Sequence, residues 1–198
     1  MIEIRDLTKS YKDLLVFDDF NLTIPESEIS CILGPSGCGK STLLNVIAGL
    51  IPYEKGVILG VDNKNISYIF QDTRLLPWGT AYQNILFALI SLYSKEKAME
   101  VADYYLDLVG LGEFKDYYPD QLSGGMKQRV SIARAFAYPS EILLMDEPFK
   151  GLDFELKNNL MDAFLKIWNE NKKTVIFVTH DLEDAKRIGH TVIRLKED

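Results

Sequence analysis

The sequence GPSGCGKS, residues 34–41, decides the fold. It matches the pattern of a phosphate-binding loop, in which a glycine is followed by four residues and then by Gly-Lys-Ser or Gly-Lys-Thr. Residues 28–33 before it are typical of a short buried strand, and residues 42–50 after it carry apolar side chains at helical spacing. Because a strand, a glycine loop and a helix follow one another in this order, the match has the context that the motif requires.

The residue types of this loop suit the binding of phosphate. Glycines let the backbone turn inward so that successive N–H groups converge on a phosphate, and the positive end of the following helix points to the same place. Lys40 adds a positive charge next to the outer phosphates, and the Ser41 hydroxyl is placed to ligate Mg²⁺. The sequence therefore predicts a nucleoside-triphosphate site. Its predicted members in the loop and the first helical turn are Gly34, Ser36, Gly37, Cys38, Gly39, Lys40, Ser41 and Thr42.

Composition restricts the kind of protein further. The chain has 198 residues, of which 47% are hydrophobic, and this is enough for one substantial core. A net charge of −7 without a block rich in Lys and Arg argues against binding to nucleic acid. The longest apolar runs, such as residues 85–90, are far shorter than the ~20 residues that cross a bilayer. Residues 1–6 do not resemble a signal peptide, so we expect a cytosolic protein that reaches a membrane only through a partner.

The pattern of apolar residues predicts an α/β fold with a mostly parallel sheet flanked by helices. Residues 141–146 and 174–179 are continuous apolar runs, as expected of buried parallel strands. Residues 25–28 are expected to form a hairpin turn between two strands. The expected strands are residues 2–4, 20–24, 28–33, 57–59, 67–70, 141–146, 174–179 and 191–195. The expected helices are residues 42–50, 81–93, 95–109, 125–137, 155–169 and 182–188.

These elements predict a single domain over residues 1–198. An N-terminal antiparallel β lobe is expected within residues 1–30 and 56–70, and an inserted helical lobe is expected at about residues 72–137. The remainder is expected to form the nucleotide-binding core.

A pair of carboxylates follows one of the predicted buried strands. Asp146 and Glu147 come after four apolar residues, and the carboxyl end of a strand in a parallel sheet faces the ligand crevice. Asp146 is therefore predicted to hold Mg²⁺, directly or through water, and Glu147 to accept a proton from an attacking water. Such a pair alone is typical of a solvated turn, but in a chain with a phosphate-binding loop it favours a hydrolytic site.

Residues 122–129, with the sequence LSGGMKQR, form a second candidate anion site. The segment places a hydroxyl and bare N–H groups at the start of a predicted helix, and it has no lysine next to the first glycine. This composition suggests that it completes the nucleotide site of another subunit. The alternative is an ordinary helix N-cap followed by flexible glycines.

With these motifs together, the sequence resembles the ATP-binding subunit of an ABC transporter from about residue 2 to residue 195. Residues 122–129 resemble the signature motif of that family, which is far more specific than the phosphate-binding loop. The resemblance implies a P-loop nucleoside-triphosphatase fold and hydrolysis of ATP to ADP and phosphate. Four further residues match family motifs: Tyr11 for stacking on adenine, Gln71 for contacting Mg²⁺ and sensing the membrane subunit, Asp153 in the loop that crosses to the opposite subunit, and His180 for touching the γ-phosphate.

The resemblance also implies a head-to-tail dimer around two ATP molecules. Ser123 and Gly125 of one subunit would close over the ATP that the other subunit holds. The residues expected to hold each ATP and its Mg²⁺ from that other subunit are Lys40, Ser41, Gln71, Asp146, Glu147 and His180. The implied partners are a second copy of the chain, integral membrane permease subunits and, indirectly, a solute-binding protein. The implied location is the cytoplasmic face of the cell membrane, reached through the permease.

A subgroup within the family is indicated by residues 75–80, with the sequence LLPWGT, and by Asn84. This segment is similar to importers of the nitrate, sulfonate and taurine type, and to some importers of thiamine precursors. Phe149 fits the same group, and Trp78 is expected near the groove that receives the permease. The alternative is that Trp78 only packs the loop against the helical lobe.

The sequence departs from the family pattern in two places. The segment of residues 56–67 is shorter than is usual in the family, and the sequence ends soon after the expected strand at residues 191–195. The sequence does not indicate whether these departures weaken dimerisation.

Two other functional classes are alternatives. The ABC ATPases that are not coupled to transport, acting on DNA, iron–sulfur assembly or ribosomes, usually carry further modules or basic extensions. A P-loop kinase is disfavoured, because residues 123–125 together with Gln71 and His180 argue against it, and a kinase would need a pocket and a lid for its acceptor. The sequence does not identify the solute.

Overall fold

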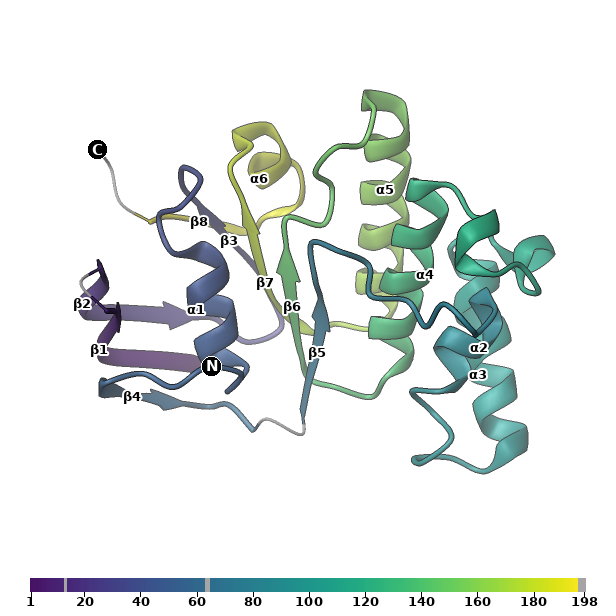
Figure 1. Ribbon diagram of the computed structural model, residues 1–198, viewed down its shortest axis with the longest axis horizontal. Coiled ribbons are helices and arrows are strands. Elements are labelled where there is room, and N and C mark those ends of the chain that lie inside the picture. Colours follow the sequence, from purple (N-terminus) through teal and green to yellow (C-terminus); the bar gives the residue numbers. More distant parts are fainter. Residues whose placement is uncertain (13, 63–64, 196–198) are drawn as a thin grey trace. The chain divides into compact units, whose positions relative to one another are not determined.

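The computed structural model describes residues 1–12, 14–62 and 65–195. The chain divides into two units (Figure 1). The first unit contains residues 1–66, 140–147 and the chain from 172 onward, and the second contains residues 67–139 and 148–171.

A parallel sheet forms the centre of the first unit. Its strands in this unit lie in the order β6, β7, β3 and β8, with bounds Ile142–Asp146, Thr174–Thr179, Ile29–Leu33 and Thr191–Arg194. Every side chain of β6 and β7 is buried, which explains why the sequences of both strands are mostly apolar. Helix α1 (Lys40–Ile47) packs on β6 and β7, and α6 (Leu182–Ile188) packs on β3 and β7. The parallel direction brings the carboxyl ends of all four strands to one edge of the sheet.

A separate antiparallel sheet completes the first unit (Figure 1). Its strand order is β2 (Leu14–Ile24), β1 (Ile2–Tyr11) and β4 (Lys55–Leu59). The sequence predicts only residues 2–4 and 20–24 as the first two strands, and this prediction is too short. The reason is that bulges interrupt the alternation of apolar and polar residues: the β1–β2 register shifts after Ile4, and Asp6 adopts a left-handed φ of 51°.

The predicted hairpin at residues 25–28 is wrong. Strand β2 lies in the antiparallel sheet, whereas β3 pairs in parallel with β7 and β8. Four of the five residues of β3 are buried, and a strand covered on both faces suits a parallel sheet rather than one arm of a hairpin. Instead, the turn is fixed to the parallel sheet, because the N–H of Ser27 donates to Thr174 Oγ1 at 2.9 Å.

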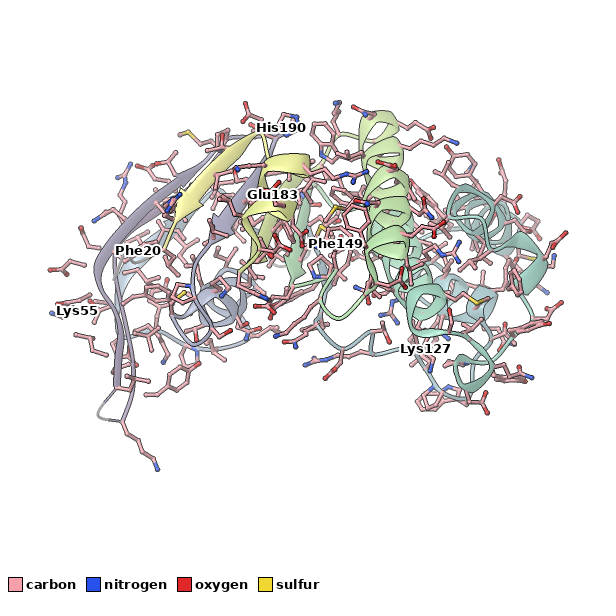
Figure 2. The ribbon with its side chains drawn as sticks, turned by 90° about the horizontal axis from the view of Figure 1, so that it is seen from above. Phe20, Lys55, Lys127, Phe149, Glu183 and His190 are labelled. Carbon is pink, nitrogen blue, oxygen red and sulfur yellow. The ribbon has the colours of Figure 1, made fainter. Side chains whose placement is uncertain are left out.

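The second unit is mainly helical. Strand β5 (Ile66–Ile69) leads into it, and its helices are α2 (Ala81–Leu86), α3 (Lys95–Leu108), α4 (Gly124–Ala137) and α5 (Phe154–Glu170). Helix α4 packs on the other three helices. Figure 2 shows Phe149 beside α5, and its ring centroid lies 6.4 Å from that of Phe164.

The helix predicted at residues 81–93 ends earlier, at Leu86. Beyond that residue the N–H groups of Ala88 and Leu89 bond to carbonyls three residues back, so the chain continues as tight turns. The other helices and the predicted α/β class with a parallel sheet are confirmed. Across the described ranges, none of the helices is long and apolar enough to cross a membrane.

Candidate active site

The phosphate-binding loop joins the end of β3 to the start of α1. Gly37 and Gly39 adopt left-handed φ angles of 82° and 104°, which residues with a side chain rarely adopt. A Cβ atom at Gly39 would also lie 2.6 Å from Val16 Cγ1 and 3.0 Å from Phe17 Cζ, so only glycine fits there. A Cβ at Gly37 would meet nothing within 4 Å, so this position needs glycine for its backbone conformation alone.

Lys40 lies inside the loop. Its side chain is buried, and Nζ donates hydrogen bonds of 2.8 Å to the carbonyl oxygens of Gly34 and Pro35. Cys38 is buried on the same loop, where its sulfur would lie 2.7 Å from a Cβ atom placed at Gly34. Ser36, in the same loop, is exposed. The ammonium group of Lys40 therefore donates to two uncharged carbonyl oxygens, and phosphate oxygens can take their place as acceptors.

Glu147 is the central acidic residue of the site. Its side chain is 9% exposed, and Oε1 lies 3.8 Å from Lys40 Nζ and 3.3 Å from His180 Nδ1. The backbone of Glu147 is in the left-handed region with φ 44°, while its N–H donates to the Val178 carbonyl at 3.1 Å. A residue with this backbone conformation typically costs about 1–3 kcal/mol and persists where the surrounding structure fixes it, often at active sites. The strand ends thus hold one carboxylate between a cation and an imidazole.

Ser41 and Asp146 form the second part of the site. Ser41 Oγ donates to Asp146 Oδ1 at 3.0 Å, and Asp146 is only 8% exposed. Among residues 1–12, 14–62 and 65–195, no group of three His, Cys, Asp or Glu side chains could hold a metal ion. This donor set suits Mg²⁺, which proteins bind through one or two carboxylates together with phosphate oxygens of the substrate rather than in a cage of side chains.

The start of α4 carries the segment predicted as a second anion site. Ser123 is the N-cap of the helix, and its Oγ accepts a hydrogen bond from the Met126 N–H at 3.3 Å. The N-cap alternative is therefore confirmed. It does not exclude an anion site, because the Ser123 hydroxyl accepts in this contact and can still donate its own hydrogen to a further acceptor. Gly125 is buried, and a Cβ there would clash with the side chain of Leu156 on α5. Gly124 is exposed with nothing within 4 Å of such a Cβ, so it is the more open of the two glycines.

The other predicted residues lie at element ends. Tyr11 ends β1, is 46% exposed, and has Lys9 Nζ 5.0 Å from its ring centroid. Asp153 is the N-cap of α5, where its Oδ1 accepts from the Leu156 N–H at 2.9 Å. Gln71 is exposed and lines a cleft of ≈ 650 Å³ in the second unit.

The structure therefore brings five of the predicted residues together in the first unit. These are Lys40, Ser41, Asp146, Glu147 and His180. Gln71, Ser123, Gly125 and Asp153 belong to the second unit, and their approach to the nucleotide stays a prediction.

The sequence marks Asn84 only as part of the subgroup pattern, and its role in organising the LLPWGT segment was missed. Asn84 is 1% exposed; its Nδ2 donates to the carbonyls of Leu76, Gly79 and Thr80, and its Oδ1 accepts from the Leu76 N–H at 2.7 Å. Trp78, which belongs to this segment, is 74% exposed. The alternative in which it only packs the loop against the helical lobe is therefore wrong. An asparagine shortly after the LLPWGT segment was the available signal, but its partners are backbone groups that no side-chain pattern reveals.

The chain matches known proteins over most of its length. The family described as ABC transporter matches residues 17–150. The taurine import ATP-binding protein of Escherichia coli O157:H7 is 42% identical over 193 residues, covering 93% of this chain and 75% of that protein. The nitrate import ATP-binding protein of Synechococcus elongatus is 41% identical over 192 residues, covering 91% and 69%.

A solved structure agrees with this assignment. The ATP-binding cassette MJ0796, solved as a dimer in a post-hydrolysis state bound to ADP and Pi, has a TM-score of 0.87 and 35% identity, covering 99% of this chain and 94% of that chain. The chain thus belongs to the ABC transporter family. The predicted P-loop cassette fold and the predicted activity, an ATPase coupled to transport, are confirmed.

Proposed function

We propose that the chain is the ATPase subunit of an importer for a small solute, acting through a separate membrane permease on the cytoplasmic face of the membrane. The observation that carries the ATPase part of this proposal is the enclosed carboxylate of Glu147 between Lys40 and His180, next to the Ser41–Asp146 pair. These groups provide a cation for phosphate, oxygen ligands for Mg²⁺ and a base for water, which together suit hydrolysis of ATP.

Each residue has a proposed role in this reaction. Lys40 exchanges the carbonyls of Gly34 and Pro35 for phosphate oxygens of ATP, and Ser41 with Asp146 holds Mg²⁺. The metal, when bound, neutralises charge on the phosphates. Glu147 accepts the proton of the attacking water.

His180 and Tyr11 complete the proposed contacts of the first unit. His180 orients the carboxylate of Glu147, at 3.3 Å, and donates toward the γ-phosphate. Tyr11 stacks on adenine with a ring that is 46% exposed.

A second copy completes each site in this proposal. The start of α4 offers the hydroxyl of Ser123 and the N–H groups of Gly125 and of the exposed Gly124, which favour an anion. Support comes from the related cassette MJ0796, which was solved as a dimer bound to ADP and Pi. ATP then joins the two copies, because it contacts both, and its hydrolysis releases them.

The proposed solute class is that of the nitrate, sulfonate, taurine and thiamine-precursor importers. The LLPWGT segment and the two import proteins similar to this chain support it. Trp78 presents a large apolar side chain that a permease subunit could cover, since it is 74% exposed.

We expect Lys40→Ala to weaken ATP binding about 10–100-fold, because a hydrogen-bonded charged donor typically contributes about 1.5–3 kcal/mol. The measurement is the dissociation constant of ATP by calorimetry. Lys173→Met is the matched control, since Lys173 is also a buried lysine of the first unit and donates to the Ser140 carbonyl at 2.7 Å. A folded Lys40→Ala protein with normal affinity for ATP would contradict the phosphate role.

The experiment that tests the proposed function is purification of a tagged Glu147→Gln variant from native membranes in mild detergent with ATP and Mg²⁺. Recovery with a protein of several membrane-spanning segments, which then stimulates the ATPase of the wild-type chain, would support the importer. A second sample without ATP controls for nonspecific recovery. Recovery from the soluble fraction only, with ribosomes, nucleic acid or no partner, would favour an ABC ATPase that is not coupled to transport.

A further inference from the structure

Arg134, in the last turn of α4, contacts the turn that follows Gln71. Its Nη1 donates to the Arg74 carbonyl at 3.1 Å, and its Nη2 donates to the Thr73 carbonyl at 3.0 Å. Two adjacent carbonyls thus receive the two arms of one guanidinium group, which is a rigid planar fork. The guanidinium group of Arg134 is partly buried, and poor solvation of its charged form lowers its pKa.

The same turn is held from its other side by aromatic rings. The Arg74 guanidinium lies 3.6 Å from the centroid of the Phe70 ring, and that ring stacks on Tyr68 at 4.0 Å with an interplanar angle of 17°. Arg74 itself has a left-handed φ of 44°, a conformation that needs support from its surroundings. Gln71 is therefore bracketed by Phe70 before it and by the Thr73–Arg74 carbonyls after it.

The Gln71 side chain has no comparable support from packing. It is exposed and lines a cleft of ≈ 650 Å³ together with Arg74, Lys127 and Gln128. Because the cleft leaves the amide room to move, its position depends on the backbone of the turn that carries it.

We propose that Arg134 is a positioning residue for Gln71, and that its fork on the Thr73 and Arg74 carbonyls fixes the turn that carries the Gln71 amide. This inference rests on the proposed role of Gln71 toward Mg²⁺. Helix α4 also carries Ser123 as its N-cap, so Arg134 ties Gln71 to the helix that bears the proposed contact to the other copy. Gln71 and Ser123, two residues of the second unit that are predicted to contact nucleotide, are then both attached to α4.

The test is Arg134→Lys, which keeps the positive charge but loses the fork. We expect the KM for Mg²⁺ in ATP hydrolysis to rise about tenfold, with ATP affinity unchanged, since one charged hydrogen bond to the turn is lost. A second measurement that does not depend on activity is amide hydrogen exchange, which should become faster in residues 70–76.

Arg5→Lys is the matched control. Arg5 also uses two arms of its guanidinium group, because Nε and Nη2 donate to the Glu3 carboxylate at 2.8 and 2.7 Å. Both residues lie on β1 in the first unit, so this exchange removes a fork that does not hold the turn. The control should leave both the KM for Mg²⁺ and exchange in residues 70–76 unchanged. If Arg134→Lys does not fold, Arg134→Gln serves in its place.

Gln71→Ala separates this inference from the proposed function. If Gln71→Ala raises the KM for Mg²⁺ while Arg134→Lys leaves it and the exchange unchanged, the positioning role is wrong and the role of Gln71 stands. If Gln71→Ala leaves the KM for Mg²⁺ unchanged, Gln71 does not serve the metal and the inference fails with it. Support requires that Arg134→Lys has little further effect in the Gln71→Ala background, because both changes then remove the same contact.

Discussion

Glu147→Gln is expected to bind ATP as the wild-type chain does but to lose turnover by about 10²–10⁴-fold, the typical contribution of a general base. The amide has nearly the same shape as the carboxylate, so it can remain between Lys40 and His180, but it cannot take a proton from water. Because hydrolysis is the step proposed to separate the two copies, the variant should also accumulate as an ATP-bound dimer. Single-turnover kinetics and light scattering after gel filtration with ATP and Mg²⁺ measure the two effects.

The control for this variant is Glu183→Gln. Glu183 lies in the first turn of α6, is 80% exposed, and pairs with Lys186 at 3.1 Å, so the same chemical change falls on a solvated ion pair. Its rate should match that of the wild-type chain. Hydrolysis at the wild-type rate by Glu147→Gln would show that another group accepts the proton.

Ser123→Arg is expected to abolish hydrolysis while leaving ATP binding by the isolated chain intact. Ser123 caps α4 in the second unit, whereas Lys40, Ser41 and Glu147 belong to the first. An arginine there removes the hydroxyl and places a long side chain where the ATP of the other copy is proposed to lie. Binding is measured at a dilution where the chain is monomeric, and hydrolysis at a concentration where it forms dimers.

Ser94→Arg controls for the loss of a helix cap. Ser94 caps α3, and its Oγ accepts from the Lys97 N–H at 3.3 Å, the same arrangement that Ser123 has with Met126. Each variant should lower stability by about 1 kcal/mol, but only Ser123→Arg should lose hydrolysis. Mixing Ser123→Arg with Lys40→Ala should restore part of the activity, because a mixed dimer contains one intact shared site. Equal loss of ATP binding in the Ser123→Arg monomer, or no activity on mixing, would contradict a site shared between copies.

The parts of the site that the sequence predicts are those in which the chemistry is local. Residues 34–41 are adjacent in the chain, and the left-handed φ angles of Gly37 and Gly39 turn the backbone next to the start of α1. The carboxylates at the end of β6 and the cap at the start of α4 are likewise defined by neighbours within a few residues. Helix and strand types were also predictable where the apolar period was unbroken, as in β7 and α5.

Only the tertiary structure showed which residues from distant segments contact one another. The approach of His180 to Glu147 depends on two strand ends that pair in the sheet, and the contacts of Arg134 and Asn84 go to backbone carbonyls. A backbone carbonyl has the same chemistry in every residue, so a sequence cannot indicate which one a side chain will reach. The bulges of β1 were missed for a related reason, as was the fact that β2 and β3 belong to different sheets. Strand pairing depends on the whole sheet, so the apolar pattern of one segment does not indicate which strand will pair with it.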